Sequence, residues 1–383
     1  MEQSRPMDRF GLYRVGDARF YSRLEAAHEH ERTGLPLKWD FNELVYSAVP
    51  WHIEPTETLE ELYRQRAQQL RENYDYLVLW FSGGADSTNI LNTFINNDIR
   101  LDEVASQVNY EATHDREGWL NGEIYHVAAP KAVAARERQP WLKHTVIDVA
   151  KATLDHFTSH ETKFDWIYHM NSYLNPNNAS KRDIKLREPH WRDMINAGKR
   201  VCFIHGIDKP RVKKIRGRWY LMFADIVDTA VSANTQILNR PWEFDELFYW
   251  SPDAPLIPVK QAYVLKHYME CATKTSFGVT TDSYNFVGGT IDGEDLYLTQ
   301  DGISRCIYPG WHPVPYQFKP LNVLFTPRDE WFFKLPDSDP AKYSWRTGLD
   351  HIWKIAPNSL KLDHNDISKG FKKCYSRPYR LGL

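Results

Sequence analysis

The residue pattern with the clearest chemical meaning is a short turn that follows an apolar run and precedes a helical pattern. It consists of Ser82, Gly83, Gly84, Ala85, Asp86 and Ser87. A turn from a strand into a helix directs several backbone N–H groups at one point, where the helix dipole adds partial positive charge. Gly83 and Gly84 can adopt positive φ and carry no Cβ, so phosphate oxygens can approach the backbone. With Ser82 and Ser87 as hydroxyl donors, the turn is a candidate phosphate-binding loop.

Asp86 is the residue of this loop that needs a separate explanation. Phosphate oxygens would repel its carboxylate unless a divalent cation lies between them, which predicts Mg²⁺ bound at Asp86. The alternative is that Asp86 stabilises the start of the helix as a cap. The loop is neither of the commoner phosphate loops, because it lacks both the Gly-Lys-Ser/Thr ending and the G-x-G-x-x-G pattern.

The elements that must position the loop can be predicted on both sides of it. Residues 76–81 form an unbroken apolar run without period-2 alternation, as expected for a parallel strand covered on both faces. Residues 85–97 have the spacing of an amphipathic helix. Thr58 and Glu61 form the pattern of a capping box, which predicts that an earlier helix spans residues 58–71.

Strand and helix patterns alternate further along the chain. We predict strands at 103–109, 144–149, 200–205 and 219–223, and helices at 124–138 and 256–270. Strands separated by helical crossovers predict an α/β fold with a doubly wound, mostly parallel, Rossmann-like sheet. We divide the chain into an N-terminal helical extension (1–72), a central nucleotide-binding domain (73–230) and a C-terminal α+β region (231–383). We expect the C-terminal region to bind the substrate or to have an accessory role.

The loop sequence S-G-G-x-D-S after a hydrophobic strand resembles the PP-loop signature of the ATP pyrophosphatase superfamily. Asparagine synthetase, tRNA lysidine synthetase, GMP synthetase and the phosphoadenosine-phosphosulfate reductases belong to this superfamily. The resemblance is complete over residues 82–87 and covers roughly residues 73–230. It implies a HUP-type α/β domain that uses ATP and Mg²⁺. The domain arrangement is also similar to that of PP-loop proteins encoded by tailed bacteriophages.

The resemblance also implies a second loop that faces the phosphates, after a glycine at the end of a later strand. In this chain it corresponds to residues 201–211. Gly206 would permit close approach, Lys209 and Arg211 would neutralise the triphosphate, and Asp208 would share the metal with the first loop. The alternative is a surface loop with incidental charge. Its position at the end of a strand, where open α/β sheets bind ligands, favours the functional interpretation.

Two basic segments are candidates for contact with a second substrate. Six of the ten residues from Lys209 to Arg218 are Lys or Arg, and residues 369–380 form a second segment that is basic and aromatic. They could bind the phosphates of a nucleic acid or an acidic small molecule. The alternative for both is a solvated surface. Polar positions at 250–253 and 260–261 are further candidate substrate contacts.

The resemblance implies an AMP-forming, ligase-type reaction. A substrate oxygen attacks the α-phosphate of ATP, pyrophosphate leaves into the 82–87 loop, and an amine, ammonia or thiol then displaces AMP. Asp86, Lys209 and Arg211 are the predicted catalytic residues, which stabilise developing charge. One alternative is a reductase-like enzyme with Cys374 as the nucleophile; Cys306 is a comparably weak candidate for a catalytic thiol. However, Cys374 lies in Lys-Cys-Tyr and not in the E-C-G-x-H motif of reductases. The other alternative is a protein without catalytic activity that binds a nucleotide or nucleic acid.

The composition agrees with a globular protein without metal–thiolate or membrane-spanning signals. Hydrophobic residues are 42% and charged residues 26% of the chain, and the net charge of −2 excludes a protein that is basic overall. The four cysteines are far apart and form no C-x-x-C pair. No apolar run approaches about 18 residues, and the N-terminus lacks a signal-peptide pattern. We therefore expect a cytoplasmic protein with reduced thiols and no membrane contact.

Overall fold

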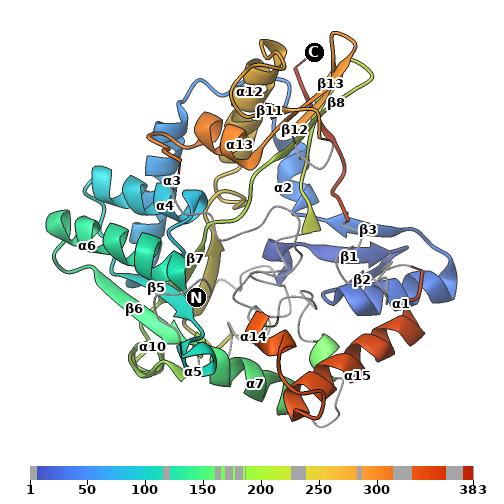
Figure 1. Cartoon of the computed structure of the whole chain (residues 1–383). Helices are drawn as coiled ribbons and strands as arrows, with labels where there is room; N and C mark the ends of the chain where they lie inside the picture. The colour runs from blue at the N-terminus through green and yellow to red at the C-terminus, as the bar shows by residue number, and fades with distance from the viewer. Residues whose placement is uncertain are drawn as a thin grey trace.

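The structure is a computed structural model, which describes residues 7–114, 121–159, 165–168, 176, 184–185, 187–225, 239–282, 287–313, 330–358 and 374–382 (Figure 1). Within these residues the strands form three sheets, of three, five and six strands. None of the described helices combines the length and the hydropathy that a membrane-spanning segment requires.

The five-stranded sheet carries the loop at 82–87, and all of its strands are parallel. Its strands are β4 (Tyr76–Trp80), β5 (Glu103–Val108), β6 (Lys143–Asp148), β7 (Val201–His205) and β10 (Glu243–Leu247). They lie in the order β10-β7-β4-β5-β6. The chain therefore adds β5 and β6 on one side of β4, and then returns to add β7 and β10 on the other side. The predicted strands at 76–81, 103–109, 144–149 and 200–205 are confirmed.

Helices flank this sheet, so the mixed α/β architecture is confirmed. The helices concerned are α3 (Leu59–Asn73), α4 (Ala85–Asn96), α6 (Ala129–Arg138), α7 (Ala150–Thr158) and α10 (Pro189–Asn196). Leu77 and Leu79 of β4 belong to a core cluster that includes residues of α3, α4 and α6. Val78, which points to the opposite face, belongs to a second cluster with residues of α7 and α10.

The start of α3 shows how local sequence signals fix an element. Thr58 Oγ1 accepts a hydrogen bond from Glu61 N at 3.2 Å, and Glu61 Oε2 accepts one from Thr58 N at 2.8 Å. This is the predicted capping box, which satisfies two N–H groups at the helix start. Before α6, the chain forms a π-helical turn at Glu123–Ala128, so the helix predicted at 124–138 is present but begins irregularly.

The N-terminal region differs from the predicted helical extension because it contains a three-stranded antiparallel sheet. This sheet has the order β2-β1-β3. Its strands are β1 (Leu12–Val15), β2 (Ala18–Phe20) and β3 (Leu37–Asp40), and helices α1 (Arg23–Thr33) and α2 (Glu43–Ala48) follow β2 and β3. Strands of three or four residues are too short for their alternation to be recognised. The helical prediction for residues 1–72 is therefore wrong for this sheet.

The six-stranded sheet lies beside the parallel sheet (Figure 1) and has the order β11-β13-β12-β8-β9-β14. Its strands are β8 (Arg211–Ile215), β9 (Arg218–Met222), β11 (Val279–Thr280), β12 (Val287–Ile291), β13 (Glu294–Leu298) and β14 (Tyr379–Leu381). Helix α12 (Leu256–Glu270), at the predicted position, and α13 (Gln300–Ile307) pack against it. A further helix, α15 (Pro340–Ile355), packs on α7.

The two larger sheets each contain strands from both sides of the predicted boundary at residue 230. The strand predicted at 219–223 is present as β9, but it belongs to the six-stranded sheet and not to the parallel one. The reason is the two-residue turn at Arg216 and Gly217, whose φ values are +50° and +76°. Such a turn makes an antiparallel hairpin of β8 and β9. In exchange, β10 joins the parallel sheet from beyond residue 230.

Candidate functional site

The loop at 82–87 leaves the carboxyl end of β4 at the point where the strand order reverses. Because all strands of this sheet are parallel, the loops after β4 and its neighbour β7 emerge at the same edge. Such a reversal point is where open α/β sheets usually bind ligands.

The two glycines of the loop have different structural roles. Gly83 has φ +77°, and a Cβ built on it would lie 2.8 Å from the backbone N of Ala128. Gly84 is the N-cap residue of α4, with φ −67° and ψ 172°, which any residue can adopt. Among the described residues, a Cβ on Gly84 would meet only Ser82 Oγ, at 3.3 Å. Packing of the fold therefore requires Gly83, whereas the space at Gly84 is open.

The loop presents backbone donors at the start of α4. Within the described part of the chain, the N–H groups of Gly83, Ala85 and Ser87 donate no hydrogen bond. Ser87 Oγ donates to Gly84 O at 3.4 Å, whereas Ser82 Oγ accepts from Gly84 N at 3.3 Å and so does not use its own O–H in this contact. For an anion at this loop, the candidate donors are therefore the backbone N–H groups and the Ser82 hydroxyl more than the Ser87 hydroxyl.

The structure brings the second predicted loop against the first. A Cβ on Gly206 would lie 3.4 Å from Ser87 N and 3.4 Å from Asp86 Cβ. A side chain at Gly206 would therefore crowd the amide groups of the first loop. The two loops therefore lie side by side, and the close approach of phosphates to Gly206 stays a prediction.

Asp86 is held by side chains from three other segments. Its two carboxylate oxygens accept hydrogen bonds from Lys209 Nζ, at 2.6 and 2.7 Å. The Tyr308 hydroxyl, just after α13, donates to the same carboxylate. The Tyr249 hydroxyl donates to the backbone oxygen of Asp86 at 2.9 Å and accepts from Asn89 Nδ2 at 3.0 Å. The carboxylate of Asp86 is thus ion-paired, and the cap position of α4 belongs to Gly84.

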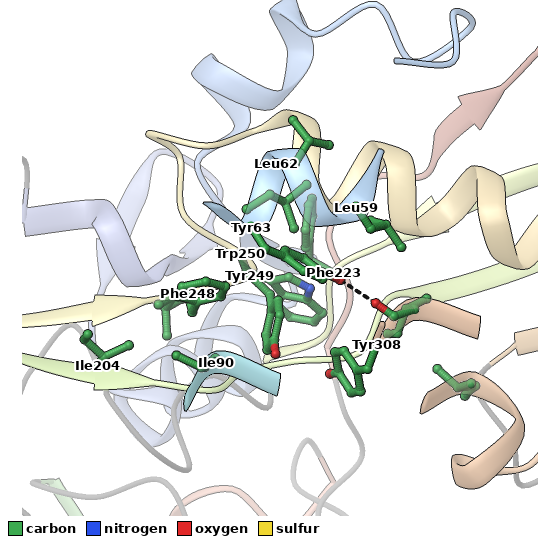
Figure 2. Close-up of a cluster of buried hydrophobic side chains, with 14 of the residues drawn as sticks. Leu59, Leu62, Tyr63, Ile90, Ile204, Phe223, Phe248, Tyr249, Trp250 and Tyr308 are labelled. Atoms are coloured by element: carbon green, nitrogen blue, oxygen red, sulfur yellow. Dashed lines mark hydrogen bonds between the residues drawn. The ribbon is translucent and has the colours of Figure 1, made fainter. Parts of the chain in front are cut away.

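The tyrosines around Asp86 stay protonated at neutral pH. Figure 2 shows Tyr63, Tyr249 and Tyr308 in one cluster of buried side chains, which also includes Ile90 of α4. Burial, and then the negative charge of Asp86, raises the pKa of Tyr308 well above its ordinary value. Burial, then the neighbouring Tyr63 and Asp86, also raises the pKa of Tyr249. Both hydroxyls therefore act as hydrogen-bond donors.

The other predicted charged residues of the second loop pair with each other. Arg211 Nη2 donates to Asp208 Oδ2 at 2.8 Å, and Arg211 Nη1 donates to Lys209 O at 3.1 Å. The buried Arg211 thus fixes the backbone that carries Lys209. Among the described residues, no group of three or more His, Cys, Asp or Glu side chains could hold a metal ion. The two predicted metal ligands, Asp86 and Asp208, each have a cationic partner in this structure.

Lys131 is a residue near the loop that the sequence did not identify. From α6, its Nζ donates to Gly83 O at 2.8 Å and to Thr88 Oγ1 at 3.0 Å. Burial lowers the pKa of Lys131 below its ordinary value. Lys131 and Lys209 therefore bring two cations to the loop from two separate segments, both later in the sequence. No spacing rule links either Lys131 or Tyr308 to the loop, and only the tertiary fold brings them there.

A buried charge cluster lies directly before the second loop. Lys185 Nζ contacts Asp245 Oδ2 at 2.8 Å and Glu243 Oε1 at 2.9 Å, while His205 Nε2 lies 2.8 Å from Asp245 Oδ1. Burial opposes ionisation of Asp245, but Lys185 and His205 outweigh it and lower the pKa of Asp245. Likewise, burial is outweighed by the two carboxylates, which raise the pKa of Lys185. Because His205 precedes Gly206, this cluster anchors the start of the second loop.

The remaining candidates are engaged elsewhere in the described structure. Burial raises the pKa of Cys306 to about 11, so its thiol is protonated at neutral pH. The backbone N–H of Cys374 donates to Asp225 Oδ1 at 3.1 Å. In the 250–253 segment Asp253 pairs with Arg9, and in the 260–261 pair Lys260 contacts Glu54 at 2.8 Å.

The two basic segments meet in one sheet. Most of segment 209–218 forms β8 and the turn to β9, and β14 of segment 369–380 pairs with β9. Residues 369–373 lie outside the described residues.

Comparison with known proteins gives no family assignment. No protein-family model matches the chain, and no curated protein matches its sequence.

Proposed function

We propose that the chain is an ATP-dependent enzyme that transfers AMP to an oxygen of its substrate and releases pyrophosphate. An amine, ammonia or thiol then displaces AMP in a ligase-type reaction. The observation that carries the proposal is the Ser-Gly-Gly-Ala-Asp-Ser loop at the reversal point of a parallel sheet. Three of its backbone N–H groups donate no hydrogen bond within the described part of the chain, and Lys131 and Lys209 lie beside it.

The sheet order supports a doubly wound, HUP-type domain for this activity. Numbered along the chain, the parallel strands lie in the order 3-2-1-4-5, as in Rossmann-like sheets. In the proposed complex, phosphate oxygens of ATP accept hydrogen bonds from the N–H groups of Gly83, Ala85 and Ser87. Such preorganised donors stabilise the charge that develops on the leaving pyrophosphate.

Magnesium would supply charge neutralisation when bound together with ATP. Asp86 and Asp208 are the carboxylates proposed to hold it, since Mg²⁺ commonly binds through one or two carboxylates plus substrate phosphates. Lys209, which pairs with Asp86 in this structure, would supply a further positive charge for the phosphates. Arg211 would continue to position the second loop through Asp208.

The two alternatives have less support from the described contacts. A reductase-like reaction would use Cys374, which lies in Lys-Cys-Tyr and not in the E-C-G-x-H motif of reductases. For the other candidate thiol, Cys306, burial raises the pKa to about 11, which disfavours a thiolate. A non-catalytic nucleotide-binding protein would retain the loop but would not cleave ATP.

The products formed from labelled ATP test the proposal. Incubation with ATP, Mg²⁺ and a pool of candidate acceptors should give AMP and pyrophosphate in equal amounts. Gly84→Val should abolish both products, while Lys143→Gln, an exposed site on β6, should leave them unchanged. Equal amounts of ADP and phosphate would contradict the AMP-forming mechanism.

A further inference from the structure

The outward face of the six-stranded sheet carries a cross-strand row of aromatic and basic side chains. The pairing register places Tyr297 opposite Gly288, Gly288 opposite Lys213, and Lys213 opposite Tyr220. Arg380 of β14 completes the row opposite Tyr220. Directly paired residues point to the same face, so all five positions share one surface.

The opposite face of this sheet is the one that packs into the core. Its residues are buried: Val212, Trp219, Leu221, Val287, Leu296, Leu298, Tyr379 and Leu381. On the outward face, Lys213, Tyr220 and Tyr297 are partly exposed and Arg380 is exposed. The row is therefore accessible at the surface and is not part of the core.

Gly288 gives the row its shape. A Cβ on this residue would lie 2.8 Å from Tyr297 Cδ1 and 2.1 Å from Leu296 O. The absence of a side chain lets the Tyr297 ring lie close to the sheet, beside Lys213 on the next strand but one. Tyr297 and Tyr220 are three strand spacings apart, about 14 Å.

The charge of this surface is positive in a chain whose net charge is −2. Besides Lys213 and Arg380, the exposed Arg218 lies on the same face, two residues from Tyr220. The one carboxylate of β13 on this face, Asp295, accepts a hydrogen bond from Thr290 at 2.6 Å. The surface thus complements a polyanion, and its two tyrosines offer rings for stacking.

We propose that this sheet face, defined by Lys213, Tyr220, Tyr297 and Arg380, binds single-stranded nucleic acid. Bases would stack on the two tyrosine rings, and the basic side chains would contact the phosphates between them. Stacking requires unpaired bases, which excludes a continuous duplex as the ligand.

The position of the surface connects it with the candidate nucleotide site. Strand β8 begins two residues after Lys209, which contacts Asp86. The face of β8 that carries Lys213 also carries Arg211, which fixes the second loop. A nucleic-acid strand bound on this face would lead toward the second loop. That the bound nucleic acid accepts AMP rests on the proposed function, whereas its binding to this sheet face does not.

Binding of labelled oligonucleotides tests the proposal. Fluorescence anisotropy with a 20-nucleotide oligo-dT, the matching oligo-U, a DNA duplex and heparin separates base stacking from charge. We expect one or both single strands to bind more tightly than the duplex and heparin. Tyr220→Leu and Tyr297→Leu should each weaken binding about ten-fold or more.

A second pair of variants measures the phosphate contacts. Lys213→Gln with Arg380→Gln should reduce the slope of log affinity against log salt by about 1.4, since each contact to a single strand contributes about 0.7. Lys143→Gln, exposed on β6 of the other sheet, is the matched control and should bind as wild type. Melting temperatures verify that each variant is folded.

Three results would overturn the proposal: no binding of either single strand, equal binding of duplex or heparin, or unchanged binding by both tyrosine variants. Gly84→Val separates this proposal from the proposed function. That variant should lose ATP binding and retain oligonucleotide binding. Wild-type protein that binds ATP but no oligonucleotide would refute the surface alone.

Discussion

The different environments of Gly83 and Gly84 predict that the same substitution has different effects at the two positions. Gly83→Ala places a residue with a side chain at φ +77°, which costs about 1–2 kcal/mol. The new Cβ would also lie 2.8 and 2.9 Å from backbone atoms of Ala128, which cannot move aside as a flexible side chain could. Overpacking of this kind costs about 1–3 kcal/mol. We expect Gly83→Ala to lower the free energy of unfolding by about 2–5 kcal/mol.

Gly84→Ala meets neither obstacle. The φ of −67° suits any residue, and the only close atom is the Ser82 hydroxyl oxygen at 3.3 Å. Exchange of glycine for alanine at an N-cap costs about 1 kcal/mol or less. Urea titration of both variants measures the difference. Equal free energies of unfolding would refute the packing argument.

A side chain at Gly84 should affect ATP binding much more than it affects the stability of the fold. Gly84→Val fills the space in front of the loop amides with a branched side chain, so isothermal titration calorimetry should detect no ATP binding while the fold persists. Unchanged ATP affinity in Gly84→Val would refute the assignment of the loop.

Three further predictions concern the charges near the loop. Asp86→Asn should remove the magnesium dependence of ATP binding and reduce turnover about a hundred-fold or more, roughly 3 kcal/mol, in a steady-state assay; a wild-type magnesium response would contradict a metal at Asp86. Tyr308→Phe keeps the ring but removes the hydrogen bond to Asp86, and urea titration should show a loss of about 1–2 kcal/mol. Lys185→Met removes the cation that two buried carboxylates share, leaving Glu243 with Arg240 and Asp245 with His205, and should cost about 3 kcal/mol or more at pH 7. Because the pKa of Asp245 is lowered in the folded wild type, the wild type should lose stability as the pH falls below about 3.8. In Lys185→Met, protonation of Asp245 removes a buried negative charge. The difference in free energy of unfolding between this variant and wild type should therefore shrink between pH 7 and pH 5.

The parts of the fold that could be predicted are those encoded by contiguous residues. The apolar run of β4, the capping box of α3 and the loop at 82–87 each lie within one short segment. Their patterns reflect burial on both faces, helix-end hydrogen bonding and turn geometry, which neighbouring residues decide. The second loop with Gly206 was implied by the family resemblance, and its position beside the first loop follows from β4 and β7 being parallel neighbours that end at the same edge of the sheet.

The parts that could not be predicted depend on pairing between distant segments. The hairpin of β8 and β9 is local, but its partners β12 and β14 come from other parts of the chain. Short strands such as β14, with three residues, carry too little alternation to reveal a partner. The same holds for the site: Lys131 lies 48 residues from Gly83, and Tyr308 lies 222 residues from Asp86. Sequence patterns extend over a few turns of helix or one strand, so they cannot reveal contacts between residues so far apart in the chain.

The partners of Asp86 couple the loop to the rest of the chain. Lys209 comes from the segment that enters the six-stranded sheet, and Tyr308 follows the helix that packs on that sheet. Any ligand that takes over the Asp86 carboxylate must replace these two contacts, so part of its binding free energy is spent on releasing them. Linkage then applies to any second ligand that displaces Lys209 or Tyr308 from Asp86. The two ligands change each other's affinity by the same factor. A hydrogen bond to a charged group contributes about 1.5–3 kcal/mol, which is enough for a ten-fold to hundred-fold effect on affinity. Because Lys209 lies two residues before β8, the proposed ligand on the six-stranded sheet would act on Asp86 through the segment that carries Lys209.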